Sequence, residues 1–476
     1  MTAAPGDVGT GRERVAELRE RMADLCAGAV DPLEVTAGLE AEGINDEAAR
    51  GYGHPDVFSL AEDLYTSTPR RPPEGERSEA PWRAVPWRHL LRGVLFGLPG
   101  LCYVVGAPVL TRTGAGVLLV LSLVLAWTVS QGTAYLGYVR LGYGKRDAAS
   151  LVLRYGLGAG LLLVVPVTVA AGELMDAGAM ATAMSAGLGC YLLSATVVQV
   201  HGGEVRLFLA LLPGVGTAAV QLARHHGGPL HSVPTAVWAA WAMSLAATTA
   251  LAVLATRRPR EPGRKRAPGR KRAPGRVVTR RDLRSALPFS LFGLLTGGLL
   301  TYTLLSALAG RSVPAGTTTV AVLSLSLSMG GAEWILYAYR RRVHDLLRTH
   351  TGMDAFTRAA RAALGGALAR YAASLLGLVV AAAIVARLPA TGVNLRTLGG
   401  FAELGCAFFL ALILQACARV GVVLALYTCA LAAEAGAALA VPRVAPGTVQ
   451  LVIAGVLLAA LSAYAARVLA RATSHR

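Results

Sequence analysis

From residue 92 to its end, the chain alternates long apolar runs with short polar connections. Each run has about 20 apolar residues, which is the length a helix needs to cross a bilayer core of about 30 Å. The fifth run is the weakest, because Pro213 interrupts it. The pattern predicts twelve transmembrane helices, at roughly 92–110, 116–138, 151–172, 178–199, 206–223, 233–256, 287–309, 314–338, 363–387, 397–418, 420–440 and 447–469.

The first 68 residues show a different pattern, with apolar positions at helical spacing inside a polar sequence. Asp31-Pro32 is typical of a helix start, and Gly43 of a helix end. These signals predict three or four short helices over 1–68, followed by a linker over 69–87. The apolar positions expected to share faces are Val15, Leu18, Met22 and Leu25 in one helix, and Val57, Leu60, Ala61 and Leu64 in another.

Composition supports a membrane protein. Mean hydropathy is +0.51 and 16% of residues are charged, whereas soluble domains have about 25% charged residues. Residues 1–80 carry 8 Lys/Arg and 17 Asp/Glu, and the remainder carries 38 and 11. The net charge of +18 therefore combines an acidic N-terminal region with a basic membrane body. Cationic loops on the cytoplasmic side satisfy topology, so we expect no nucleic-acid partner.

The distribution of basic residues predicts orientation. With the N-terminal region in the cytoplasm, the inner segments from residue 81 onward hold 30 Lys/Arg and the outer segments hold 6. Such a bias favours a multi-pass protein of the plasma (inner) membrane with both termini cytoplasmic. An even number of spans follows from the same orientation.

A basic segment divides the twelve predicted spans into six and six. Residues 257–284 hold 13 Lys/Arg, and the hexapeptide RKRAPG occurs twice in succession. Proline and glycine argue against a helix there. One interpretation is a topology anchor and spacer; the other is a contact with anionic lipid or with the acidic region. The expected halves are residues 88–256 and 286–476, with a cytoplasmic linker over 257–285.

Matching segments indicate that the two halves are repeats. LFGL occurs at 95–98 and again at 291–294, each time at the start of a half. SQGTAYLGYVR (130–140) and SMGGAEWILYAYR (328–340) both run Ser-x-Gly-x-Ala and close with aromatic residues and arginine. Repeats of even span number share one orientation, which predicts a pseudo-twofold axis along the membrane normal and a site between the halves.

The segment YVRLGYGKRDAASLVLRYGLGAG (138–160) resembles the connection between spans two and three of polysaccharide flippases in the multidrug/oligosaccharidyl-lipid/polysaccharide flippase superfamily. The corresponding stretch of the second half, YRRRVHDLLRTHTGMDAFTRAARAAL (339–364), is longer but likewise basic and helical. The resemblance implies a carrier that moves a lipid-linked glycan to the outer leaflet. The major facilitator layout fits less well, because Leu141 and Gly142 stand where its loop motif has an acid and an arginine.

Ionisable residues inside spans are costly and usually face a cavity or a partner. The candidate substrate or coupling residues are Glu333, Glu403, Glu434, Arg154 and Arg370. For Glu333 the alternatives are a protonatable coupling site, a counter-charge for a cationic partner, or a structural carboxyl group. The two arginines either reach back to the membrane interface or pair with the pyrophosphate of a lipid carrier.

No common catalytic or metal-binding motif occurs in the sequence, so we expect neither an enzyme nor a cofactor. The fold expected is all-α and integral to the membrane, with about twelve helices in two six-helix halves and a small helical N-terminal region. The first hypothesis is a flippase or exporter of a lipid-linked saccharide. The alternatives are a proton- or sodium-coupled drug exporter, and a scaffold subunit for polysaccharide synthesis. Expected partners are membrane lipids, a lipid-linked glycan and a cytoplasmic protein that binds the N-terminal region.

Overall fold

The structure is a computed structural model that describes residues 8–29, 31–68, 86–100, 105–110, 113–224, 232–257, 278–313, 315–349, 353–385 and 392–469. Every described element is a helix. The chain divides into two units, Met1–Ala84 and Val85–Arg476. Most of both expected linkers, 69–87 and 257–285, lies outside the described residues.

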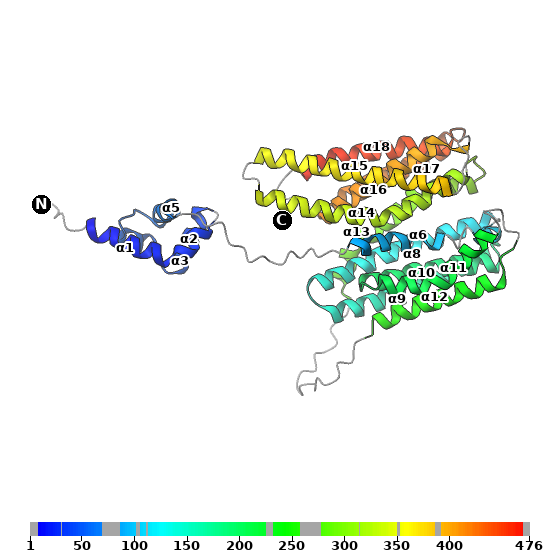
Figure 1. Cartoon of the computed structure of the whole chain (residues 1–476), viewed down its shortest axis with the longest axis horizontal. Coiled ribbons are helices and arrows are strands. Elements are labelled where there is room, and N and C mark those ends of the chain that lie inside the picture. The colour runs from blue at the N-terminus through cyan, green and yellow to red at the C-terminus, as the bar shows by residue number, and fades with distance from the viewer. Residues whose placement is uncertain are drawn as a thin grey trace, which may run out of the picture. The chain divides into compact units, whose positions relative to one another are not determined.

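The N-terminal unit contains five helices rather than the expected three or four (Figure 1). A turn at Met22 splits the first expected helix, and Asn45 starts a short helix of its own. The helix after Pro32 begins as expected, because Asp31 accepts a hydrogen bond from the Glu34 amide at 3.0 Å. Gly43 lies past its end with φ of 81°, a conformation that favours glycine. The helices are α1 Val8–Arg21, α2 Ala23–Gly28, α3 Pro32–Ala41, α4 Asp46–Gly51 and α5 Val57–Ser67.

This unit has a hydrophobic core of its own. The apolar face expected for α5 is buried, which confirms that part of the prediction. In the first two helices the prediction fails at one position: Leu25 is 37% exposed and the neighbouring Cys26 is buried in its place. The buried face keeps its spacing of three and four residues through Val15, Leu18, Met22 and Cys26, so the face continues at Cys26 and leaves Leu25 beside it.

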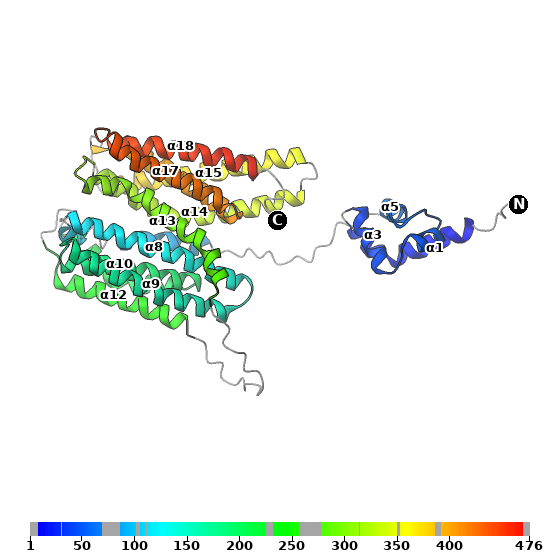
Figure 2. The ribbon, with the colours of Figure 1, turned by 180° about the vertical axis from the view of Figure 1, so that it is seen from behind.

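The second unit is a bundle of long helices, seen from two sides in Figures 1 and 2. Eleven of its described helices are long and apolar enough to cross a membrane, which agrees with an all-α membrane protein. The expected first span, 92–110, contains α6 Pro86–Gly97 and the 3-10 turn η1 Ala107–Leu110, but residues 101–104 lie outside the described ranges. The eleven are α8 Thr113–Gly142, α9 Arg146–Leu174, α10 Ala179–Val200, α11 Glu204–Arg224, α12 Thr235–Ala255, α13 Arg280–Leu308, α14 Ala315–Thr349, α15 Met353–Val385, α16 Leu395–Ala416, α17 Val420–Ala440 and α18 Pro446–Val468.

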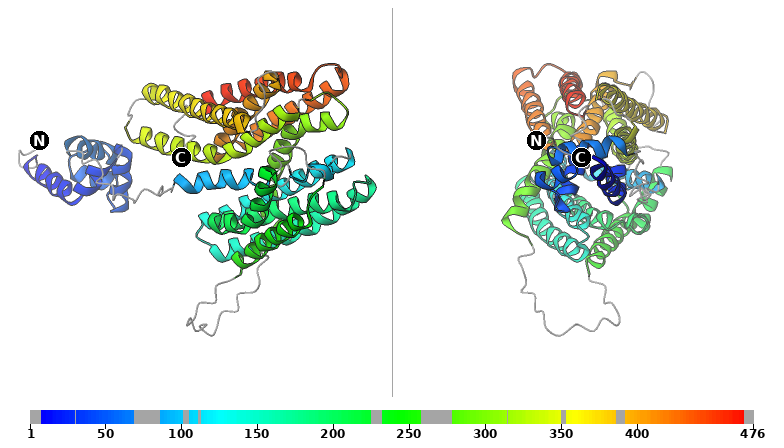
Figure 3. Two further views of the ribbon diagram at one scale, coloured as in Figure 1. Left: turned by 45° about the vertical axis from the view of Figure 1, so that its right-hand side comes forward. Right: turned by 90° about the vertical axis from the view of Figure 1, so that its left-hand side faces the viewer.

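Two details of the expected spans are corrected. Pro213 does not break the fifth span, since α11 continues through it. Helices α14 and α15 run beyond the expected span ends at 338 and 363, and they include most of the stretch 339–364 that the sequence predicts to be basic and helical. They form a long hairpin that has no equal in the first half, where α8 and α9 meet over a short turn near Gly144 (Figure 3).

The two halves meet through two helix pairs, α8 with α13 and α6 with α14. In the repeat, α6 of the first half corresponds to α13 of the second, and α8 corresponds to α14. A twofold axis between the halves therefore maps the α8–α13 contact onto the α14–α6 contact. Within the halves, α8 and α9 pack as α14 and α15 do, and α10 and α12 pack as α16 and α18 do. This arrangement agrees with the repeat in the sequence.

Glycines bring both inter-half pairs into close approach. A Cβ on Gly93 in α6 would lie 2.6 Å from the Leu327 carbonyl oxygen of α14. A Cβ on Gly293 in α13 would lie 3.0 Å from Trp127 of α8. The α8–α13 seam continues along the helices, with Gly116 against Leu308 at one end. Small residues at such crossings permit close packing of helices within a membrane.

Candidate functional site

A cluster of charged side chains lies where α6 begins. Arg88 and Arg92 stand one helical turn apart, so both reach the same side of α6. There they bind Glu204, the first residue of α11: Arg88 Nη2 lies 2.6 Å from Oε2, and Arg92 Nε and Nη2 lie 2.9 and 2.7 Å from Oε1. The Glu204 side chain is 1% exposed. This part of the cluster lies entirely within the first half and ties α6 to α11.

Arg92 also links the two halves. Its Nη1 donates to Oε2 of Glu333 at 2.9 Å, and His89 Nδ1 lies 3.1 Å from the same oxygen. Glu333 belongs to α14 of the second half, and its side chain is 35% exposed. Glu333 thus pairs with Arg92 and His89 of a neighbouring helix, a contact that fits both a counter-charge for a cationic partner and a structural carboxyl group. We name Arg88, His89, Arg92, Glu204 and Glu333 the charged junction.

The pseudo-equivalent contact between α8 and α13 has different chemistry. Tyr135 of α8 stacks on Phe289 of α13, with ring centroids 3.8 Å apart. Nearer the helix ends, Arg140 Nη2 donates to Asp282 Oδ1 at 2.7 Å. Both inter-half contacts therefore carry an ion pair at the same end of the bundle, which we call the basic end. It is the end that the charge distribution predicts to be cytoplasmic.

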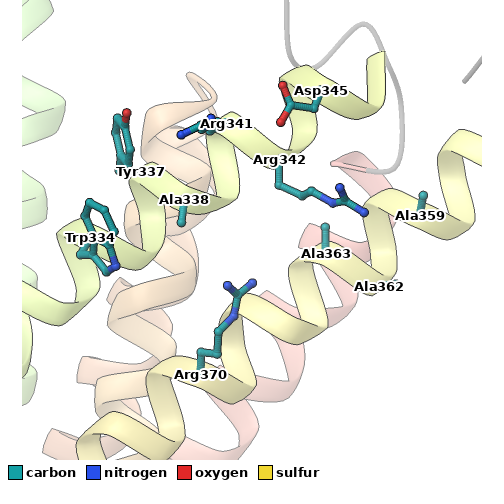
Figure 4. Close-up of a pocket in the computed structure, with 10 residues that line it drawn as sticks. All are labelled: Trp334, Tyr337, Ala338, Arg341, Arg342, Asp345, Ala359, Ala362, Ala363 and Arg370. Carbon is teal, nitrogen blue, oxygen red and sulfur yellow. The ribbon is translucent and has the colours of Figure 1, made fainter. Parts of the chain in front are cut away.

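A pocket of about 600 Å³ opens between α14 and α15 at the basic end (Figure 4). Arg342 reaches from α14 toward α15, and Arg370 points back toward α14. The lining from α14 comprises Trp334, Tyr337, Ala338, Arg341, Arg342 and Asp345. Three alanines of α15 form much of the opposite wall. The structure thus brings Arg370 together with two arginines that sequence reasoning did not single out.

The remaining candidate residues lie apart from these features. Glu434 on α17 is 1% exposed, and its Oε2 has no hydrogen-bond partner among the described residues. Glu403 on α16 faces Gly455 of α18. Arg154 is exposed on α9. Across the described ranges, no hydrogen bond or ion pair joins these three to the charged junction.

A second pocket, of about 520 Å³, lies at the opposite end of the second half. Arg311, Arg396 and Arg443 line it. Arg311 donates to the Val444 carbonyl at 2.5 Å and to the Tyr302 hydroxyl at 3.3 Å. These are three of the six basic residues expected on the outer side, and two of Arg311's hydrogen bonds bind the ends of helices together.

Sequence reasoning missed most of the charged junction. A signal was present: Arg88 and Arg92 share a face of a helix that enters the membrane, where isolated charges are costly. Their spacing predicts a carboxylate partner, and Glu204 is an acid in a basic body at the start of another span. What the sequence does not provide is the pairing of α6 with α11 and α14.

Comparison with known proteins gives one match. No protein-family model matches the chain, and no curated protein matches it. The chain is similar to a solved structure described as the inward-facing conformation of a multidrug resistance MATE family transporter of the MOP superfamily. The identity is 15%, the TM-score is 0.35, and the match covers 81% of this chain and 94% of that one.

Proposed function

We propose that the chain is a transporter of the MOP superfamily that works by alternating access and moves a lipid-linked saccharide from the cytoplasmic to the outer leaflet. The observation that carries the proposal is the charged junction between two structurally related halves. It closes the basic end with side chains that water can reach, and such contacts can open and reform.

The energetics of the junction divide it into a permanent and a reversible part. Glu204 is buried within the first half, and removing one partner of a buried ion pair costs about 3–5 kcal/mol. Glu333 is partly exposed across the halves, and such pairs contribute about 0–1 kcal/mol. Within the charged junction, the buried Glu204 therefore keeps α6 joined to α11, and the contact between Arg92 and Glu333 is the one that breaks more easily.

The cargo is inferred from charge and exposure. The basic end presents an arginine pocket on α14 and α15, and α15 has the smallest buried share among the eleven described spans. Arginine suits phosphate groups, because its planar fork can donate two parallel hydrogen bonds. A cargo with a phosphate-bearing head and a lipid tail fits both features.

A second candidate is a proton- or sodium-coupled exporter of small molecules, and Glu434 favours it. A carboxyl group that is 1% exposed within a membrane helix is costly and commonly marks a coupling or ion site. Its Oε2 has no partner among the described residues. In this candidate, Glu434 takes up the coupling ion and the arginine pocket has no part in transport.

The test compares lipid-linked saccharide in the inner leaflet of cells that lack the protein with cells that express wild type, Glu333→Gln or Glu434→Gln. We expect the precursor to accumulate without the protein and wild type to relieve it. Glu333→Gln is expected to relieve it poorly. Unchanged precursor and surface glycan in cells without the protein would remove the flippase from consideration, and loss of drug efflux on Glu434→Gln would then establish the exporter.

A further inference from the structure

The pocket between α14 and α15 concentrates positive charge without neutralising it. It contains Arg341, Arg342 and Arg370 and one acid, Asp345. Within the described part of the chain, none of these three arginines forms an ion pair. Arg370 donates Nε to its own helix, at the Gly366 carbonyl at 2.9 Å, and its guanidinium group points toward α14 (Figure 4).

Like charges that face one another repel, and an anion placed between them removes the repulsion. Guanidinium groups bind phosphate through charge-assisted, often bidentate hydrogen bonds. Alanines at 359, 362 and 363 leave the space between the helices open. A volume of about 600 Å³ lies in the range of small-molecule sites, roughly 300–1,000 Å³. The pocket is therefore large enough for a phosphate or diphosphate head with part of a sugar.

The depth of the pocket suits a lipid rather than a freely soluble ligand. The helix from Arg370 to Val385 rises about 22 Å at about 1.5 Å per residue. The bilayer core is about 30 Å thick, so with Val385 at its far boundary Arg370 lies about 8 Å inside the core, on the side of the basic end. Beyond it, α15 exposes Leu376, Val380 and Ile384 by 64%, 51% and 70%. A head in the pocket would have its tails beside this apolar face.

The need for positive charge on the cytoplasmic side, which sets the orientation of the chain in the membrane, does not by itself explain the pocket. The first half places Arg140, Lys145 and Arg146 at the basic end on a short turn, and these residues suffice for a positive inner loop. The second half instead extends α14 and α15 past the membrane and directs arginines between them. The extension creates a pocket that the topology does not require.

We infer that the α14–α15 pocket binds the phosphate or diphosphate head of an anionic amphiphile in the leaflet at the basic end. The inference deepens the proposed function and rests on it for the identity of the cargo. Binding itself does not require transport. Intact flipping by a wild-type protein that does not bind the probe would sink this inference alone, and binding by a wild-type protein that does not flip lipid would sink the proposed function alone.

The experiment uses the full chain in phosphatidylcholine nanodiscs and a fluorescent short-chain phosphatidic acid, with anisotropy as the readout. The variants are Arg342→Gln/Arg370→Gln and Arg342→Lys/Arg370→Lys. The matched control is Arg281→Gln/Arg358→Gln, which removes two exposed arginines at the basic end that do not line the pocket. Diacylglycerol with the same chains tests whether the phosphate is needed, and inorganic pyrophosphate serves as the soluble competitor.

We expect Arg342→Gln/Arg370→Gln to weaken binding at least tenfold. We expect the lysine pair, which keeps the charge but loses the planar fork, to weaken it severalfold. The control pair should stay within twofold of wild type. Wild-type affinity in the glutamine pair, equal loss in the control pair, or equal binding of diacylglycerol would each overturn the inference. If the glutamine pair fails to fold, the lysine pair decides the question.

The two sources of phosphate are separated by the competitor. If pyrophosphate displaces the fluorescent lipid and binds at least as tightly as the lipid does, the pocket is a phosphate site whose ligand is a soluble compound. Displacement that requires a large excess of pyrophosphate supports the site with a lipid as its ligand. No displacement at any concentration overturns recognition of phosphate.

Discussion

The two carboxylates of the charged junction should respond differently to neutralisation, although both bind Arg92. Glu204→Gln removes a charge that is 1% exposed and accepts three hydrogen bonds from Arg88 and Arg92. Arg92 keeps Glu333, and Arg88 is 42% exposed, so water offsets part of the loss. The expected destabilisation is about 3 kcal/mol, the lower end for a broken buried pair.

Glu333→Gln removes a charge that is 35% exposed, and Arg92 keeps Glu204. The expected cost is about 1 kcal/mol, the upper end for exposed pairs. Because this contact joins the halves, its loss should change the balance between conformations rather than unfold the protein. A change of about 1 kcal/mol shifts a two-state population roughly fivefold, since about 1.4 kcal/mol corresponds to a factor of ten.

Two measurements separate these effects. Melting temperature in nanodiscs reports stability, with Arg358→Gln as the control for charge removal at an exposed site. Electron paramagnetic resonance between labels at positions 146 and 358, in a background without the six native cysteines, reports the distance between the halves at the basic end. We expect Glu204→Gln to lower the melting temperature and Glu333→Gln to lengthen the distance. Equal destabilisation by both, or an equal change of distance, would refute the division of the junction.

Three further predictions concern packing and reactivity. Gly330→Ala should destabilise the protein by about 1–3 kcal/mol and lower its melting temperature, because the new Cβ would meet the His89 carbonyl oxygen and, at 2.8 Å, the Gly93 amide nitrogen. The control is Gly331→Ala, whose Cβ would meet only Ser374 at 3.7 Å, and it should leave the melting temperature unchanged. Tyr135→Ala should cost about 1 kcal/mol beyond its buried area, with no dependence on salt, and a change in that cost between low and high ionic strength would contradict an aromatic contact. Burial raises the pKa of the Cys26 thiol, although Thr68 and Arg19 act to lower it. A raised pKa leaves less thiolate at a given pH, so at pH 8 Cys26 should react more slowly with a disulfide reagent in the folded chain than after denaturation. The rate of this reaction should rise as the pH increases.

The sequence predicts the helices well because their signal is local. Apolar length identifies the spans, and the repeat indicates which helices of the two halves correspond. The error at Leu25 arises because Leu25 and Cys26 both lie three or four residues after Met22, and the pattern alone does not decide which of the two is buried. The expected span ends at residue 338 because charged residues begin there, whereas the helix continues through them, as the basic and helical stretch 339–364 predicts.

The sites are less predictable because they depend on pairing between distant segments. Glu333 stands out in the sequence, but its partner lies 241 residues away. Glu204 lies at a span boundary, where an acid is usually solvated; only the packing of α11 against α6 buries it. Arg370 was recognised as an unusual charge, whereas Arg341 and Arg342 belong to a basic run whose direction only the hairpin determines.

The two contacts between the halves, α8 with α13 and α6 with α14, differ in their chemistry, and the difference indicates where the halves would separate first. Helices α8 and α13 touch from Gly116 at one end to the Arg140–Asp282 pair at the other, with an aromatic stack between. The α6–α14 contact differs from it in the partly exposed pair of Arg92 and Glu333 at its basic end. In the proposed carrier, the halves would separate first at that pair while α8 and α13 stay joined, and a lipid tail would remain in the bilayer while its head passes between the halves.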